Sequence, residues 1–569
     1  MKKRKKHIPI GIDDFKELIE EYYYFADKTL FIKELLDSKA KVTLITRPRR
    51  FGKTLNLSMV RYFFEKILAS ASPQSDAVDL RRALFAGLAI EQHADCMKHQ
   101  GKYPVIWLTL KDVKTDAWDS CYDKICRVIA SEFKRHFEAL QPWLSELESG
   151  QIAEIIAGTA SQAQYENALL DLSFYLERAY QSKVIILIDE YDAPVYAGYF
   201  NGYYNEVVNF LRGFLGAGLK GNISLNFGLL SGILRVAKES IFSGINNLEV
   251  CTLLRKDYDD KFGFLENEVA DLFSYFDLQN RHDEVRQWYD GYRSGNYLVY
   301  NPWSIINLIK NRGQIEPYWV NTSDNALITD RLKKSSSMMK EELEILVTGG
   351  KIKKPIQENI TMPDIDSSEG ALWEFLLFCG YLTFENYRRE GRSFFAELSL
   401  PNEEVATVYE TSFKQWFLDR STMRDYTKML ENLVAGQPIY FKQMFERFSR
   451  ETLSYFDVRG NEPEQFYHAL VLGMLASLVQ THEVRSNRES GYGRYDVMII
   501  PKDHQKSGII IEFKNVEIQT HETLEMAAKN ALKQIEERQY ETELRARGIK
   551  TVLKFGIAFQ GKESLVLMG

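Results

Sequence analysis

The chain has 569 residues, of which 45% are hydrophobic and 13% aromatic, enough for roughly three or four domains with cores of their own. Its net charge of −7 argues against nucleic-acid binding over the whole surface, although residues 331–354 and 485–494 are rich enough in Lys and Arg to line a local groove. No apolar run spans a bilayer, no secretory signal follows the basic start, and the five scattered cysteines indicate reduced thiols. We therefore expect a cytoplasmic protein without a membrane partner.

The first motif in chain order is a strand that leads into a phosphate-binding loop. The apolar residues 42–46 predict the strand, and a helical pattern begins near Thr54. In the sequence Gly52-Lys53-Thr54, backbone N–H groups at the helix start would bind phosphates. Lys53 would reach the β- and γ-phosphates of ATP, and Thr54 would ligate Mg²⁺. A bare G-K-T is also compatible with an ordinary helix start, so this motif needs support from elsewhere in the chain.

The loop departs from the usual pattern G-x-x-x-x-G-K-[ST] at its first glycine. Arg47 occupies that position, and Pro48, Arg49 and Arg50 follow it. We therefore expect the loop to turn at Pro48. The extra guanidinium groups, among them those of Arg49 and Arg50, are candidates for direct contact with phosphate.

Support for a nucleotide site comes from residues 184–194, which read VIILIDEYDAP. The five apolar residues predict a strand that is buried on both faces, and Asp189 and Glu190 follow at its carboxyl end. Ligands of open parallel sheets bind at that edge. Asp189 would hold Mg²⁺ through a water molecule, and Glu190 would polarise the water that attacks the γ-phosphate. The two motifs together predict ATP binding and hydrolysis.

Two further apolar runs, residues 104–110 and 223–232, predict additional strands of the same sheet. Ser231 ends the second run, where a polar residue that senses the γ-phosphate is expected. Arg235 follows and is a candidate for stabilising the transferred charge. An equally acceptable interpretation of Arg235 is a surface helix residue that forms a salt bridge.

A separate set of polar residues lies near the C-terminus, in the sequence GYGRYDVMIIPKDHQKSGIIIEFK. Asp496 opens one apolar run, and a second run delivers Glu512, with Lys514 two positions later on the same side of the strand. Two adjacent strands can bring these groups to one point, where two carboxylates suit Mg²⁺ or Mn²⁺ and a lysine can steady a water or a phosphate. This chemistry fits phosphodiester hydrolysis, whereas an isolated E-x-K is more often a solvated edge strand.

The arrangement resembles the PD-(D/E)xK nuclease superfamily, with Asp496 as the D and Glu512 to Lys514 as the ExK. The resemblance implies a helix, two strands and a second helix as the core of the fold. It also implies an upstream helical acid, which Glu464 would supply, and a downstream glutamine, which Gln534 would supply.

The whole chain resembles a bacterial family of AAA-ATPase-like proteins with a C-terminal PD-(D/E)xK domain. Shared stretches include RPRRFGKT, IDEYDAP, SGILRVAKESIFSGINNL, WYDGYRSG, YNPWSI, YWVNTS and IIIEFK. The resemblance implies ATP and nucleic acid, with DNA favoured, as partners, and a role in mobile-element defence or DNA processing. It also implies a homo-oligomer, because AAA-type ATPases often complete their sites between neighbouring subunits, so Arg235 could act in its own site or a neighbour's.

These observations predict an α/β protein with four regions. We expect a P-loop parallel-sheet domain in residues 1–250, a helical lid-like region in 251–315, a mainly helical region in 316–450 and a nuclease-like domain in 451–569. The predicted function is an ATPase joined to a Mg²⁺-dependent nuclease. The alternative is a nucleotide-controlled switch whose C-terminal domain binds nucleic acid or a partner without cleaving it.

Overall fold

The protein forms two compact units in a computed structural model. The first comprises Met1–Trp319 and Lys353–Asn402, and the second Val320–Ile352 and Glu403–Gly569. The structure describes residues 5–66, 81–235, 241–242, 246–278, 281–319, 331–332, 335–416, 420–453, 470–471, 473–474, 477–478, 481–490, 493–516, 522–560 and 563–569.

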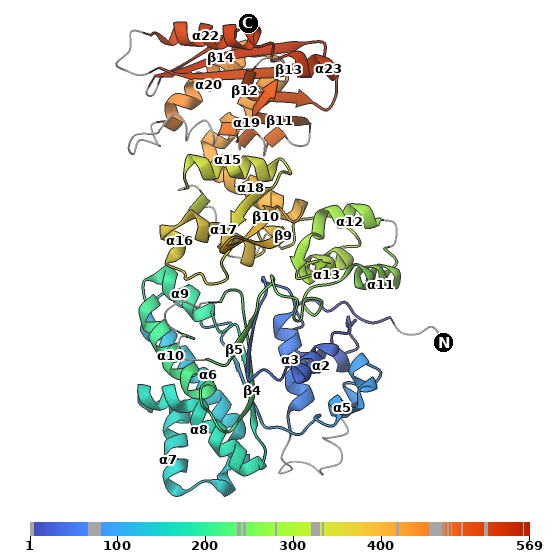
Figure 1. Cartoon of the computed structure of the whole chain (residues 1–569), viewed down its shortest axis with the longest axis vertical. Helices are drawn as coiled ribbons and strands as arrows, with labels where there is room; N and C mark the ends of the chain where they lie inside the picture. Colours follow the sequence, from blue (N-terminus) through green and yellow to red (C-terminus); the bar gives the residue numbers. More distant parts are fainter. Residues whose placement is uncertain are drawn as a thin grey trace. The chain divides into compact units, whose positions relative to one another are not determined.

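A five-stranded, entirely parallel sheet forms the centre of the first unit, with the strand order β2-β3-β4-β1-β5 (Figure 1). Its strands are β1 (Val42–Thr46), β2 (Val105–Thr109), β3 (Val184–Asp189), β4 (Leu225–Gly232) and β5 (Leu248–Cys251). Because β4 separates β1 from β3, the loop after β1 and the acidic pair after β3 approach one sheet edge from either side of β4. The predicted α/β fold with a parallel N-terminal sheet is confirmed.

Helices cover both faces of this sheet, which explains why β1 and β3 are buried along their whole length (Figure 1). The described helices that precede β4 are α1 (Phe15–Glu20), α2 (Leu30–Ser38), α3 (Lys53–Phe64), η1 (Ala89–Gln92), α5 (Ala94–Met97), α6 (Trp118–Leu140), η2 (Gln141–Trp143), α7 (Glu146–Ala157), α8 (Gln162–Tyr180), α9 (Ala193–Asn201) and α10 (Tyr204–Leu219). Apolar residues of α6, α8 and α10 pack with those of the strands into one large core.

The rest of the first unit combines helices with small sheets. Its elements are α11 (Glu266–Phe276), α12 (His282–Tyr289), β6 (Tyr292–Ser294), β7 (Tyr297–Val299), α13 (Pro302–Lys310), α16 (Asp364–Ser367), α17 (Glu369–Phe378), β9 (Thr383–Glu390) and β10 (Ser393–Ser399). Strands β6 and β7 form a hairpin between α12 and α13, which the helical pattern of this region did not predict. Strand β8 (Ile352–Pro355), β10 and β9 form a three-stranded sheet in that order.

The second unit contains a five-stranded mixed sheet with the order β11-β12-β13-β14-β15, in which only β13 and β14 run parallel. Its strands are β11 (His482–Ser490), β12 (Gly493–Pro501), β13 (Gly508–Asn515), β14 (Val552–Gln560) and β15 (Glu563–Met568), and its helices include α15 (Ser337–Val347), α18 (Glu403–Trp416), α19 (Arg420–Val434), α20 (Pro438–Leu453), α22 (Leu524–Glu537) and α23 (Thr542–Ala546). Helix α22 packs directly on the sheet. Gly556 of β14 makes this close approach possible, because a Cβ at this position would collide with the backbone carbonyl of Ala528.

Across the described ranges of the chain, no helix is both long and apolar enough to cross a membrane.

Candidate nucleotide and metal sites

Asp189 is the centre of the polar cluster at the edge of the parallel sheet. It ends β3 and is fully buried. The hydroxyl of Thr54, in the first turn of α3, donates to one of its carboxylate oxygens at 2.8 Å, and the hydroxyl of Ser231, in β4, donates to the other at 2.5 Å. Burial raises the pKa of Asp189, and the two hydrogen bonds oppose that rise. Three segments far apart in sequence are thereby joined at one carboxylate.

Lys53 is buried beside this cluster and is held by the loop that precedes it. Its ammonium group donates to the backbone carbonyls of Arg47 at 3.0 Å and Pro48 at 2.9 Å. Burial lowers the pKa of Lys53, while the nearby carboxylates, that of Glu190 first, oppose the change. Gly52 caps the helix with a φ of 81°, in the left-handed region that favours glycine. The lysine is therefore placed where a phosphate could replace the two carbonyls as its partner.

Arg47, at the position of the usual first glycine, points away from the phosphate side of the loop. Its buried guanidinium donates to the carbonyls of Thr46 and Cys251, each at 2.8 Å, and lies 5.3 Å from the ring centre of Phe262. Burial lowers the pKa of Arg47 to about 10. This arginine fastens the loop to the segment after β5, so it replaces the glycine with an anchor and not with a phosphate ligand.

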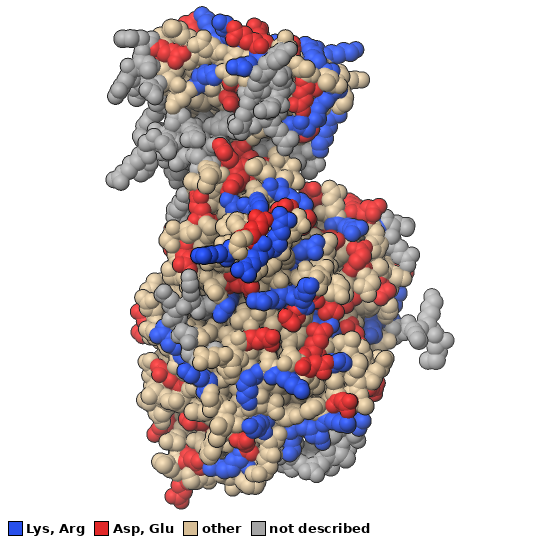
Figure 2. Space-filling model, in the orientation of Figure 1, with Lys and Arg blue, Asp and Glu red and all other residues tan. Residues whose placement is uncertain are grey.

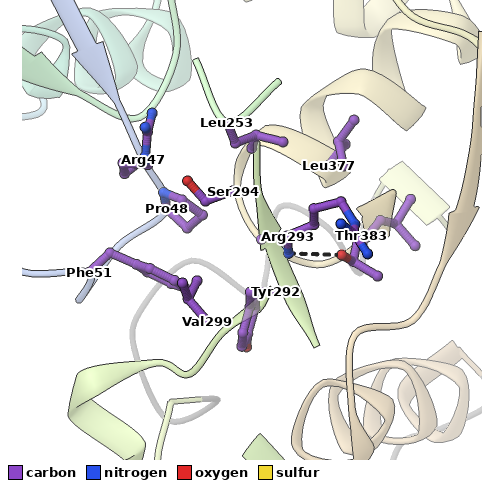
Figure 3. Close-up of a pocket in the computed structure, with 12 residues that line it drawn as sticks. Arg47, Pro48, Phe51, Leu253, Tyr292, Arg293, Ser294, Val299, Leu377 and Thr383 are labelled. Carbon is purple, nitrogen blue, oxygen red and sulfur yellow. Dashed lines mark hydrogen bonds between the residues drawn. The ribbon is translucent and has the colours of Figure 1, made fainter. Parts of the chain in front are cut away.

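The rear of the loop lines a small, mainly apolar pocket (Figure 3). Pro48 and Phe51 face the hairpin residue Tyr292 and the segment after α17 across it, and the backbone N–H of Arg293 donates to the hydroxyl of Thr383 at 3.1 Å. The loop is therefore supported from behind by packing, which fixes its shape without the first glycine.

Arg49 and Arg50 both lie on the loop, in different surroundings. The guanidinium of Arg50 stacks over Trp303 at 4.0 Å, and the charge of Glu190 partly offsets the lowering of its pKa by burial. The backbone carbonyl of Arg49 accepts a 3.4 Å hydrogen bond from the indole of Trp319. Both residues are close to the cluster, and their contact with phosphate stays a prediction.

Asp192, which the sequence motif did not single out, connects the acidic loop to the end of β4. Its buried carboxylate accepts hydrogen bonds from the backbone N–H groups of Ile233 at 2.7 Å and Leu234 at 3.1 Å. Burial raises its pKa to about 6. Tyr191 reinforces the link, because its hydroxyl donates to the carbonyl of Leu234 at 2.6 Å. The sequence signal that could have indicated this link is the third acid of IDEYDAP, which is Asp192.

The two remaining nucleotide-site residues are less constrained. Glu190 adopts a left-handed backbone conformation with a φ of 49°, which turns the chain sharply after β3. Arg235 follows the clamped end of β4, and its Nε atom is buried without a hydrogen-bond partner in the described ranges. The salt bridge of the alternative interpretation is not formed with any described residue.

In the second unit, strand pairing brings Asp496 beside Glu512. Val497 pairs with Ile511 in the antiparallel β12–β13 ladder. Asp496, one residue before Val497, therefore lies opposite Glu512, one residue after Ile511. A carboxylate oxygen of Asp496 accepts a 2.7 Å hydrogen bond from the backbone N–H of Phe513. Glu512 is buried, with 2% of its surface exposed. Asp496 and Glu512 therefore lie side by side at the end of an apolar strand pair.

Lys514 and Gln534 complete this constellation. The ammonium of Lys514 donates to Gln534 at 2.6 Å and lies 3.4 Å from Glu512. The amide of Gln534, on α22, donates to the same Glu512 oxygen and, at 3.1 Å, to the hydroxyl of Tyr540. Tyr540 is a residue that the sequence analysis missed, since it follows α22 without a recognisable motif. Glu464 lies outside the described residues.

The other oxygen of Glu512 is suited to a metal ion. It is buried and has no hydrogen-bond partner in the described ranges. Burial, followed by the charge of Asp496, raises the pKa of Glu512 to about 8. An orphaned buried carboxylate oxygen beside a second carboxylate matches the hard oxygen ligands of Mg²⁺ and Mn²⁺. Within the described residues no group of three or more His, Cys, Asp or Glu gathers, so the protein ligands there would be Asp496 and Glu512.

Two regions of the chain match models of known protein families. Residues 9–242 match a family model described as a predicted AAA-ATPase, and residues 462–568 match that of the PD-(D/E)XK nuclease superfamily. A relative from Azotobacter chroococcum mcd 1, described as an uncharacterized protein in the vnfD 5' region, is 26% identical over 556 residues, which are 96% of this chain and 95% of the relative. The two matched regions contain the Asp189 and Glu512 clusters respectively.

Proposed function

Because the chain carries an AAA-ATPase-like domain and a PD-(D/E)XK nuclease superfamily domain, we propose that it binds and hydrolyses ATP and cleaves nucleic acid, with DNA favoured. The observation that carries the nuclease half is the unpartnered buried oxygen of Glu512 beside Asp496. The nucleotide half rests on the hydrogen bonds of Thr54 and Ser231 to Asp189. A role in mobile-element defence or DNA processing in the cytoplasm, with several copies assembled, is part of the proposal.

At the nucleotide site, each residue is placed for one task. Lys53 would exchange the two loop carbonyls for the β- and γ-phosphates, and Thr54 and Asp189 would hold Mg²⁺, which neutralises phosphate charge when bound. Glu190 would accept the proton of the attacking water. Arg235, with Arg49 and Arg50 on the loop, would stabilise the charge that moves to the leaving phosphate.

At the nuclease site, Asp496 and Glu512 would hold Mg²⁺ or Mn²⁺, which supplies a nucleophilic hydroxide at neutral pH. Lys514 is held at 2.6 Å by Gln534, so its ammonium stays next to the carboxylates while it orients the water or the scissile phosphate. The amide of Gln534 also fixes one oxygen of Glu512 and leaves the other for the metal. Glu464 would add the upstream acid of the superfamily.

Purified full-length protein tests this proposal when ATP turnover and cleavage of labelled DNA are measured with Mg²⁺, with Mn²⁺ and with EDTA. We expect metal-dependent cleavage and metal-dependent phosphate release. The second candidate function, a nucleotide-controlled switch that binds without cleaving, predicts ATP-dependent binding of nucleic acid and no cleavage under any metal. RNA of the same sequence shows whether DNA is favoured.

A further inference from the structure

The sheet β8-β10-β9 has a buried part and an exposed end. In the buried part, Phe384 of β9 faces Leu398 of β10, and both are almost fully covered, as is Ala396. Toward the β9–β10 turn, the strands extend beyond this core, and Phe394 pairs with Arg389. The hairpin end is therefore held by its own core but presents side chains to solvent.

Two aromatic rings are stacked at this exposed end. The ring centres of Tyr387 and Phe394 lie 5.4 Å apart with 24° between their planes, and Phe394 is 45% exposed. On the other side of the hairpin, the ammonium of Lys353 lies 5.3 Å from the ring of Phe395. Exposed aromatic faces next to cations are typical of surfaces on which nucleic-acid bases stack.

Basic residues surround these rings, although the whole chain is acidic. Figure 2 shows Lys and Arg side chains gathered over β9 and β10. Lys353 and Arg388 share the carboxylate of Glu390. Arg389 donates to a backbone carbonyl, and neither it nor the exposed Arg392 forms an ion pair with a described residue. The two arginines next to Phe394 therefore keep their charge available for an external anion.

The neighbouring loop after β5 carries charges of both signs. Arg255 pairs with Glu358 at 3.3 Å; burial and the charge of Glu358 raise the pKa of Tyr387, and the charge of Arg255 opposes that rise. Lys256 follows Arg255 in sequence. Acids lie on the same two strands: Glu385 and Glu390 on β9, and Glu397 on β10, which accepts a 2.8 Å hydrogen bond from Asn386. Among the cations of the hairpin, Arg389 and Arg392 are the ones without an ion pair to a described residue.

We propose that the end of the β9–β10 hairpin binds single-stranded nucleic acid, with bases stacked on Phe394 and Tyr387 and backbone phosphates paired with Arg389 and Arg392. A single strand fits better than a duplex because only unpaired bases offer their faces to a ring. An acidic polypeptide would satisfy the arginines but not the rings. The inference rests on the proposed function for its substrate class, and it uses residues outside both catalytic constellations.

Binding of labelled oligonucleotides to the full chain in EDTA, where cleavage cannot occur, tests this proposal. Phe394→Ala should weaken single-strand binding about tenfold, and Phe394→Trp should restore it. The matched control is Phe200→Ala, because Phe200 is 48% exposed and contacts the ring of Tyr199 edge to face but lies outside the β9–β10 hairpin. Unchanged single-strand affinity in Phe394→Ala would overturn the proposal. So would a duplex that binds as tightly as the single strand and loses as much affinity in Phe394→Ala.

The arginines give a second, independent readout that does not depend on the core of the hairpin. The double variant Arg389→Ala/Arg392→Ala should reduce the slope of log affinity against log salt by about 1.4, since each phosphate contact contributes about 0.7 on a single strand. Arg127→Ala, at a side chain that is 78% exposed, should leave the slope unchanged. An unaltered slope in the double variant contradicts the proposal. The proposal is also contradicted if polyglutamate displaces the single strand equally well from the wild type and from Phe394→Ala. Loss of metal-dependent cleavage in Asp496→Ala is a separate result, so the two proposals can fail separately.

Discussion

The hydroxyl of Thr54 in α3 donates a 2.8 Å hydrogen bond to Asp189 of β3, although β1, the strand that leads into α3, is not a neighbour of β3 in the sheet. Strand β4 lies between them, and its Ser231 occupies the second oxygen of the same carboxylate. The residues expected to hold Mg²⁺ are thus oriented before any nucleotide arrives. Little reorganisation is then needed on binding, which favours an active nucleotide site.

Two substitutions separate nucleotide binding from turnover. Lys53→Ala should abolish ATP binding or weaken it severely, because it removes the only buried ammonium in the described part of the loop. Glu190→Gln should keep ATP binding while lowering turnover by about 10²-fold or more, because Asp189 still holds the metal but the base is lost. Equilibrium binding of a labelled ATP analogue and steady-state phosphate release measure the two effects. Wild-type turnover in Glu190→Gln would exclude this residue as the base.

The N-terminal strands and the acidic pair could be predicted from sequence because their signals are local. Asp189 and Glu190 directly follow a buried apolar run, so the sequence alone places them at the carboxyl end of a strand. The role of Arg47 could not be predicted, since its partners are carbonyls such as that of Cys251, about two hundred residues away in sequence. The same holds for Asp192, whose partners belong to another strand. Such contacts depend on tertiary packing, which local patterns do not contain.

The nuclease constellation shows the same division. Alternation along β13 placed Glu512 and Lys514 on one side, and the structure brings Asp496 and Gln534 to them. The hydrogen bond between Gln534 and Tyr540 was not predictable, because the chain must first turn back after α22. Residues 320–352 join the second compact unit although they precede part of the first, and no sequence pattern marked that exchange.

Restoring the usual glycine at position 47 should harm the protein. Arg47→Gly removes a buried guanidinium and leaves the carbonyls of Thr46 and Cys251 without partners, at about 1–3 kcal/mol for each. We expect the N-terminal unit to lose about 3 kcal/mol or more in its free energy of unfolding. Arg50→Gly is the matched control: Arg50 is exposed and has a φ of 67°, which glycine adopts easily, so it should change stability by about 1 kcal/mol or less. Denaturant unfolding in which the two variants lose equal stability would refute the anchoring role.

Removing the lysine of the nuclease site should affect the rate more than the metal. Lys514→Ala should lower the cleavage rate by about 10²-fold and leave the affinity for Mn²⁺ within about threefold of wild type, because lysine is a donor and not a ligand. Gln534→Ala should lower the rate as well, since it frees both Lys514 and an oxygen of Glu512. Single-turnover cleavage and calorimetric Mn²⁺ titration give the two quantities. A loss of metal affinity that matches the loss of rate in Lys514→Ala would mean that the lysine acts through the metal.

Metal binding at the nuclease site should depend on pH in a defined direction. The pKa of Glu512 is raised to about 8 in the absence of metal, so at pH 6 the group is mostly protonated, whereas a metal ligand must be ionised. Mn²⁺ affinity should therefore rise as pH increases from 6 to 8, by up to about tenfold per unit, and level off above 8. Binding at pH 7 should release close to one proton, measurable by calorimetry in buffers of different ionisation enthalpy. Affinity that is flat over this range would show that Glu512 is already ionised or is not a ligand.

Cleavage of labelled DNA by Asp496→Ala and by Glu512→Ala, in the presence of Mg²⁺, tests the central claim most directly. Both variants should retain the wild-type fold, measured by circular dichroism, and lose metal-dependent cleavage. Asp503→Ala is the matched control, because Asp503 is an exposed carboxylate in the turn between the same two strands and should leave the rate unchanged. Cleavage at the wild-type rate in either carboxylate variant would contradict the account, because the reaction would then take place at another site.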